Sequence, residues 1–312
     1  MARVNVFGMS EKAEATAAQE TENNIEPSEV MLARRCSLMA GWLYFVTLMV
    51  VIMVVIGGLT RLTNSGLSMV EWRPLTGWLP PFSSDDWMLI FEKYKTSPEY
   101  QKINAGMSLL EFKKIFWLEY IHRLWGRIIG LAFVIPFICF VAFGWVNRRL
   151  TLSLLGLLIL GGLQGGLGWY MVQSGLVDRP DVSQYRLAAH LALALVIIAA
   201  LFWTARGLNR SCRKNWEFLD ANSVIGLRRS AYGVLFAVFL TAVSGAFVAG
   251  LDAGLAYNTF PLMDGNWVPE GLLTMTPPFI NFFENTITVQ FDHRVLALST
   301  AVLVIAVWVA AL

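Results

Sequence analysis

The sequence predicts an all-α polytopic membrane protein, built from a four-helix-bundle half and an incomplete second copy of that half. Of the 312 residues, 56% are hydrophobic and 15% are charged, whereas soluble domains carry about 25% charged residues. Six apolar runs are each about 20 residues long, which is the length that crosses a bilayer as a helix. Two parts of the chain also repeat one pattern of motifs, which indicates a duplicated unit.

The six predicted spans account for most of the apolar sequence. They run over 41–59, 124–145, 150–172, 187–205, 231–250 and 295–312. Between the first two spans, the segment 86–117 has apolar residues at helical spacing, with Lys on the other face. Amphipathic helices on the outer surface are therefore expected there.

Basic residues predict the orientation of the chain, because cytoplasmic connections carry an excess of Lys and Arg. Arg34 and Arg35 precede the first span, and Arg148 and Arg149 fill the second connection. In contrast, the connection over 251–292 contains neither Lys nor Arg. The amino terminus is therefore expected in the cytoplasm, and the odd-numbered connections are expected outside.

Four regions follow from these spans. Residues 1–35 are polar and rich in Glu, and are expected to form a disordered cytoplasmic tail. Residues 36–210 form the first four-helix half, 211–230 a cytoplasmic linker, and 231–312 a partial second half. No cleavable signal peptide is visible, and the acidic, Arg-poor start argues against a mitochondrial transit peptide, so a bacterial inner membrane is expected. The net charge of +2 gives no reason to expect a nucleic-acid partner.

An internal repeat relates the two halves. "VVIGGLTRLTNSGL" leads out of the first span and "EYIHRLWGR" opens the second, whereas "GAFVAGLDAGL" leaves the fifth span and "QFDHRVLAL" opens the sixth. Both copies run in the same direction, as in a parallel repeat. If the repeated unit has four helices, about two further helices are expected beyond Leu312. A genuine six-helix protein is the alternative.

All three histidines lie at the outer ends of predicted spans. His122 opens the second span, His190 lies one turn into the fourth, and His293 opens the sixth. Ionisable side chains inside a span are costly and call for a reason. One possible reason is hydrogen bonding at the membrane interface. The other is ligation of heme iron, which the matched depth of the three histidines favours. His122 and His190 suit a bis-histidine site in the first half, and the partner of His293 is expected in a missing helix.

Three arginines accompany these histidines. Arg123 and Arg294 directly follow His122 and His293, and Arg127 lies one turn after Arg123. Because Arg matches a carboxylate bidentately, these residues are candidate partners for heme propionates. Snorkelling of their side chains to the outer headgroups is the alternative.

One carboxylate distinguishes the two copies. Glu119 precedes His122 by three residues and so shares its helical face, whereas the equivalent position before His293 is Gln290. This difference suggests chemistry at the first site and electron storage at the second, with Glu119 as the candidate catalytic residue. A favourable interaction of Glu119 with the helix dipole is the alternative.

Taken together, these motifs resemble the heme A synthase family of the proteobacterial and mitochondrial type. The resemblance runs from Trp42 to the end and rests on "GGLTRLTNSGLSMVEWRPLTGWLPP", "EYIHRLWGR", "RLAAHLALAL", "NTFPLMDG" and "FDHRVLA". It implies eight spans in two four-helix halves, each with a histidine pair. It also implies an oxidoreductase that converts the C8 methyl group of heme O, through a hydroxymethyl stage, to the formyl group of heme A for cytochrome oxidase.

The resemblance also implies roles and partners. His122 and His190 match the pair that holds the substrate heme, His293 matches the first ligand of heme b, and Glu119 matches the essential carboxylate. The second ligand of heme b has no counterpart before Leu312. The implied partners are heme O, an external electron donor of ferredoxin type, a heme O synthase and further copies of the chain. The protein is expected to be embedded in the lipid bilayer, with its heme sites toward the periplasm.

Two other classes of protein stay open. A membrane cytochrome b that only transfers electrons would explain the histidines, but not the difference between Glu119 and Gln290. A transporter built from repeats would explain the duplication, but it would place ionisable groups and helix breaks near the midplane. In this sequence the polar residues gather at the outer face instead.

Overall fold

Six long helices form the body of the protein. The computed structural model describes residues 27–72, 77–176, 182–211 and 225–312. Within this part of the chain, the long helices are α2 (Pro27–Leu62), α5 (Leu109–Ala142), α6 (Arg148–Gly175), α7 (Gln184–Ser211), α8 (Ile225–Gly250) and α10 (Thr286–Ala310). Each has the length and apolar composition needed to cross a membrane. The prediction of an all-α membrane protein with six spans is therefore confirmed.

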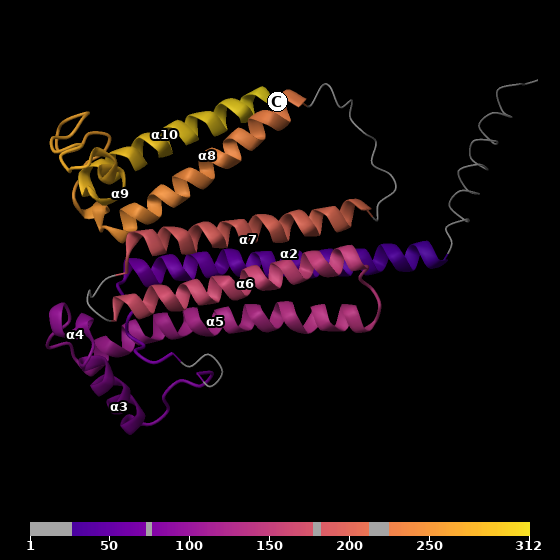
Figure 1. Cartoon of the computed structure of the whole chain (residues 1–312), viewed down its shortest axis with the longest axis horizontal. Helices are drawn as coiled ribbons and strands as arrows, with labels where there is room; N and C mark the ends of the chain where they lie inside the picture. Colours follow the sequence, from indigo (N-terminus) through magenta and orange to yellow (C-terminus); the bar gives the residue numbers. More distant parts are fainter. Residues whose placement is uncertain (1–26, 73–76, 177–181, 212–224) are drawn as a thin grey trace, which may run out of the picture.

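The long helices form a group of four and a pair. In Figure 1, α2, α5, α6 and α7 lie almost parallel, and the tilted pair of α8 and α10 lies beside α7. Short helices gather at one end of this arrangement, which we call the loop end. They are α3 (Ser84–Lys95), α4 (Pro98–Lys102), η1 (Ala253–Leu255), η2 (Pro278–Ile280) and α9 (Asn281–Glu284). Helices α3 and α4 confirm the helices predicted within 86–117.

Three predicted boundaries were wrong. Helix α2 begins at Pro27, so residues 27–35 are helical and not a disordered tail; residues 1–26 lie outside the described residues. Helix α8 begins at Ile225, inside the predicted linker, of which 212–224 also lie outside the described residues. The third error concerns α5, which begins at Leu109 and places His122 inside a helix and not at its start.

The early start of α5 has one local and one tertiary cause. The Ser108 hydroxyl accepts a hydrogen bond from the Glu111 N–H, and the Glu111 carboxylate accepts one from the Ser108 N–H, which is a capping box. The first turns of α5 then pack against α3 in an aromatic cluster. The cluster contains Trp87, Phe91, Tyr94, Phe112, Phe116 and Tyr120. These aromatic contacts stabilise a helical extension that carries too many charges to be read as a span.

The core of the four-helix group lies away from the loop end. Its buried members come from the middle of α2 and α7 and from the parts of α5 and α6 far from the short helices, and they include Leu43, Val46, Phe133, Phe137, Leu154, Leu157, Ile197 and Leu201. Two indole N–H groups also join α2 to α5, from Trp42 to the Ala132 carbonyl at 2.8 Å and from Trp125 to the Met49 carbonyl at 2.9 Å. His122 and His190 lie in the other part of this group, nearer the loop end.

The two halves meet at the loop end through α7 and α8. Gly250 closes α8 so near to α7 that a Cβ atom there would lie 2.6 Å from the Cα of Gln184. Beside this contact, the Tyr185 hydroxyl donates to Glu284 Oε1 at 3.0 Å. The rings of Tyr185, Phe247 and Phe283 contact one another. This close approach between the halves therefore depends on the absence of a side chain at Gly250.

We expect Gly250→Ala to destabilise the protein by about 1 to 3 kcal/mol, because the added methyl overpacks a contact with backbone atoms. Thermal unfolding of the purified protein in detergent measures the loss. Gly233→Ala in the same helix is the control, since a Cβ there meets nothing within 4 Å and alanine favours a helix over glycine. Equal stability of the two variants would contradict the close contact.

Candidate functional site

His122 and His190 come from different helices of the four-helix group. His122 projects from α5 and His190 from α7, and both of these helices pack against α2. Both side chains are partly buried. The pairing of these two histidines around a heme iron stays a prediction.

Gln164 on α6 contacts His190. The Gln164 amide donates to the His190 carbonyl at 3.0 Å, and its nitrogen lies 3.3 Å from His190 Nε2. Two buried polar atoms here, His190 Nδ1 and Gln164 Oε1, have no hydrogen-bond partner among the described residues. Buried polar atoms almost always have partners, so this site has the unmet bonding capacity expected of a place that receives a polar or metal-containing ligand.

His293 contacts a serine of the neighbouring helix. The Ser244 hydroxyl on α8 lies 2.8 Å from the Thr241 carbonyl and 2.7 Å from His293 Nδ1. When the hydroxyl donates to the Thr241 carbonyl, its oxygen can accept a hydrogen bond from a protonated Nδ1. In that tautomer Nε2 keeps its lone pair, which is the state that a metal-ligating histidine needs. The side chains at His293 therefore fit an iron ligand.

Glu119 lies almost fully buried, with 2% of its surface exposed, and binds the loop that follows α2. Its Oε2 accepts hydrogen bonds from the Ser68 hydroxyl and the Met69 N–H, both at 2.7 Å. Its Oε1 accepts from Arg123, which also donates to the Met69 carbonyl at 2.9 Å and the Glu71 carbonyl at 3.1 Å. Glu119 and Arg123 together form a clamp on this loop, which we call the first clamp.

A second clamp occupies the equivalent place on α10. Arg294 donates to the Thr259 carbonyl at 2.6 Å and to the Tyr257 carbonyl at 2.7 Å. The Gln290 amide donates to the same Tyr257 carbonyl at 2.8 Å. The repeat seen in the sequence therefore extends to the way in which each half holds the loop after its first helix.

The two clamps differ in the polarity of their loop partners. In the first clamp the loop presents donors, and a carboxylate at Glu119 accepts them. In the second clamp the loop presents a carbonyl, and the Gln290 amide donates to it. The Glu-to-Gln difference, which the sequence alone linked to chemistry, thus also has a structural cause.

The three arginines predicted as propionate partners have other contacts. Arg123 and Arg294 direct guanidinium N–H groups to loop carbonyls, as described above. Arg127 lies one turn beyond Arg123, and its guanidinium carbon is 5.8 Å from the centre of the Trp78 ring. A role of these arginines toward propionates stays a prediction.

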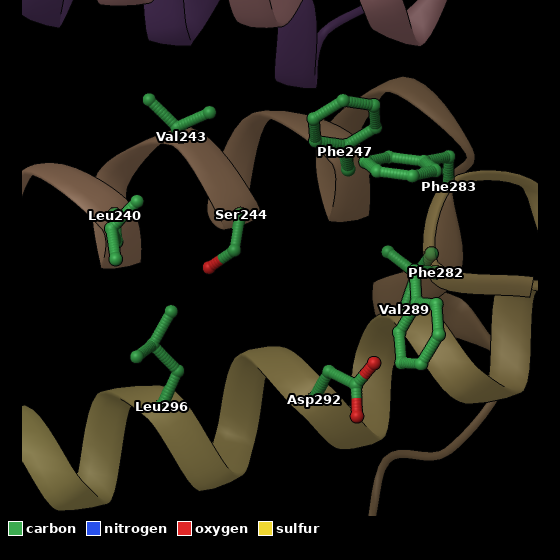
Figure 2. Close-up of a pocket in the computed structure, with 9 residues that line it drawn as sticks. All are labelled: Leu240, Val243, Ser244, Phe247, Phe282, Phe283, Val289, Asp292 and Leu296. Carbon is green, nitrogen blue, oxygen red and sulfur yellow. The ribbon is translucent and has the colours of Figure 1, made fainter. Parts of the chain in front are cut away.

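A pocket of about 230 Å³ lies between α8 and α10 near the loop end. Figure 2 shows the Ser244 hydroxyl and the Asp292 carboxylate directed into it, with Phe247, Phe282 and Phe283 on one side. Ser244 thus lines this pocket and also contacts His293. No pattern in the sequence predicted this pocket.

Comparison with known proteins identifies the family. The family model described as cytochrome oxidase assembly protein matches residues 40–312. A heme A synthase of Nitrosospira multiformis is 56% identical over 268 residues, which cover 86% of this chain and 74% of the relative. A heme A synthase of Parvibaculum lavamentivorans is 52% identical over 272 residues, covering 87% of this chain and 77% of the relative. The chain belongs to the heme A synthase family.

The heme A synthase family also includes a eukaryotic relative of this chain. The heme A synthase of Arabidopsis thaliana is 47% identical over 273 residues, which cover 86% of this chain and 60% of the relative. No solved structure matches the chain. The resemblance inferred from the sequence motifs is therefore confirmed at the level of the family.

Several contacts of this heme A synthase family member were not predicted from sequence. Ser244, Gln164 and the loop residues Ser68 and Met69 contact predicted site residues, but none has a distinctive spacing from its partner. Ser244 lies beside a glycine in "AVSGAF", where the repeat places "VVIGGL" in the first half. Alignment of these two segments places Ser244 one residue before a glycine of the repeat, and this position is the signal that could have predicted its contact with His293.

Proposed function

We propose that this chain is a heme A synthase, which oxidises the C8 methyl group of heme O through a hydroxymethyl stage to the formyl group of heme A. The observation that supports the proposal most is the presence of His122 and His190 on two helices of the same half, which also carries the buried Glu119. Family membership supports the same reaction. We place the protein in a bacterial inner membrane, with its heme sites toward the periplasm.

Each predicted residue has a role in this proposal. His122 and His190 hold the iron of the substrate heme O, and Glu119 orients or transfers protons at that site. Nε2 of His293 holds heme b, which supplies electron transfer when it is bound. Arg123, Arg127 and Arg294 are the candidate partners of the propionates. An electron donor of ferredoxin type, a heme O synthase and a second copy of the chain are the proposed partners.

Heme extraction tests the function directly. Cells that make heme O are grown with and without this chain, and the extracted hemes are separated by chromatography. New heme A that depends on the chain, and that is absent with His122→Ala, is the expected result. Heme O alone, together with a bis-histidine heme spectrum of the purified protein, would instead identify a membrane cytochrome b that only transfers electrons.

The bond between Ser244 and His293 leads to a separate prediction. Ser244→Ala should weaken binding of heme b at His293 by about 10- to 100-fold, because ligands that lose their orienting hydrogen bond lose metal affinity to this extent. Titration of the purified protein with heme b, followed by its Soret absorbance, measures the change. The titration uses a His122→Ala, His190→Ala background, so that only the second site responds.

Ser299→Ala is the matched control for this titration, since Ser299 is an exposed serine of α10. It should bind heme b as tightly as the unsubstituted background. An unchanged affinity in Ser244→Ala would show that the hydroxyl does not support the ligand.

A further inference from the structure

Each of the three histidine rings lies against a glycine of the neighbouring helix. A Cβ atom added to any of these glycines would lie 3.1 to 3.2 Å from the nearest ring atom of its histidine. The pairs are Gly57 on α2 with His122, Gly168 on α6 with His190, and Gly245 on α8 with His293. The same arrangement thus occurs at every histidine of the chain.

This arrangement is not a general property of the glycines in these helices. A Cβ atom would meet nothing within 4 Å at most other helical glycines, including the direct neighbour Gly58 and the nearby Gly165 and Gly166. Small residues often serve only to let helices approach closely. Here the atoms that a methyl group would meet belong to imidazole rings, and not to the backbone of a facing helix.

The space between each ring and its glycine is too small for a methyl group. Spacings of 3.1 to 3.2 Å are shorter than ordinary van der Waals contact, so an added methyl group would have to displace the ring. His293 is held from another direction by Ser244, and His190 lies against Gln164. At His122 the nearest atom is Nε2 itself, at 3.2 Å from the added carbon. Displacement there changes the position of a nitrogen that can ligate iron.

We propose that Gly57, Gly168 and Gly245 are positioning residues that set the orientation of the three imidazole rings toward heme iron. The inference rests on the proposed function, because it takes the histidines as heme ligands. A ring that is tilted or shifted by a methyl group presents its lone pair to the iron at the wrong angle. The expected consequence is weaker ligation together with a changed ligand field, while the helices stay in place.

The test measures heme binding, separately from heme A production. The purified full chain with His293→Ala is titrated with heme b as the probe, so that only the first pair responds. Gly57→Ala and Gly168→Ala are compared with Gly58→Ala and Gly166→Ala. We expect the first two variants to bind heme b about 10- to 100-fold more weakly and to shift the electron paramagnetic resonance of the low-spin ferric heme. The two controls should match the parent in both measurements.

A second comparison separates the ring from helix packing. In His122→Gly, free imidazole added to the solution can ligate the iron without being tethered to α5. If Gly57 acts on the tethered ring, added imidazole should restore the low-spin spectrum equally in His122→Gly and in His122→Gly, Gly57→Ala. Circular dichroism of the heme-free proteins checks that each variant is folded.

Two results from the glycine variants would overturn the inference. One is that Gly57→Ala and Gly58→Ala share the same heme affinity and the same resonance. The other is that added imidazole fails to restore the spectrum only when Gly57→Ala is present. Normal heme binding without heme A production would reject the proposed synthase activity and leave the glycine inference intact. Absence of a low-spin spectrum from the unsubstituted chain would reject both.

Discussion

Glu119→Gln is expected to lower the conversion of heme O to heme A by about 10²- to 10⁴-fold, the range in which positioned acids and bases contribute to catalysis. The substitution keeps the size of the side chain but removes its charge and one acceptor oxygen. An amide group in place of Oε2 would also meet the Met69 N–H, which is itself a donor. Chromatography of hemes from cells with equal amounts of each variant measures the conversion. Full conversion by Glu119→Gln would reject a catalytic role.

Matched variants separate chemistry from loop binding. Ser68→Ala removes one hydrogen bond to Glu119 and leaves the carboxylate in place. If Glu119 transfers or orients protons, Ser68→Ala should retain far more activity than Glu119→Gln. If the two variants lose activity equally, Glu119 acts by holding the loop after α2.

Arg123→Gln is expected to destabilise the protein by about 3 to 5 kcal/mol, because it leaves the Glu119 carboxylate buried without its cation. The two side chains are 8% and 3% exposed, so solvent screens the pair little. Thermal and denaturant unfolding of the purified protein measure the loss. The double variant Arg123→Gln, Glu119→Gln should recover part of it, since it leaves no uncompensated charge.

Arg294→Gln is the internal comparison for this prediction. It removes the equivalent bonds to loop carbonyls, but its neighbour Gln290 carries no charge. The expected loss is therefore smaller, at about 1 to 3 kcal/mol. Equal losses in the two halves would show that the buried charge of Glu119 contributes little beyond its hydrogen bonds.

The sequence by itself determined the spans, the repeat and the family. Hydropathy is a local property, so runs of apolar residues locate six helices without knowledge of what packs against them. The repeat also predicted that Glu119 is equivalent to Gln290 and that Arg123 is equivalent to Arg294. In the structure, these residues form the two clamps. The roles of these residues in heme chemistry stay predictions.

Only the tertiary structure decided what each of these side chains contacts. Glu119 binds residues 50 and 51 positions away in the chain, and such bonds arise from the packing of a loop on a helix. The periodicity of hydrophobic residues in the sequence does not predict such bonds. The start of α5 likewise depends on aromatic contacts with α3, which outweigh the charges in its first turns. The glycines beside the histidines were visible in the sequence, but their function depends on distances between helices, which hydrophobic spacing does not specify.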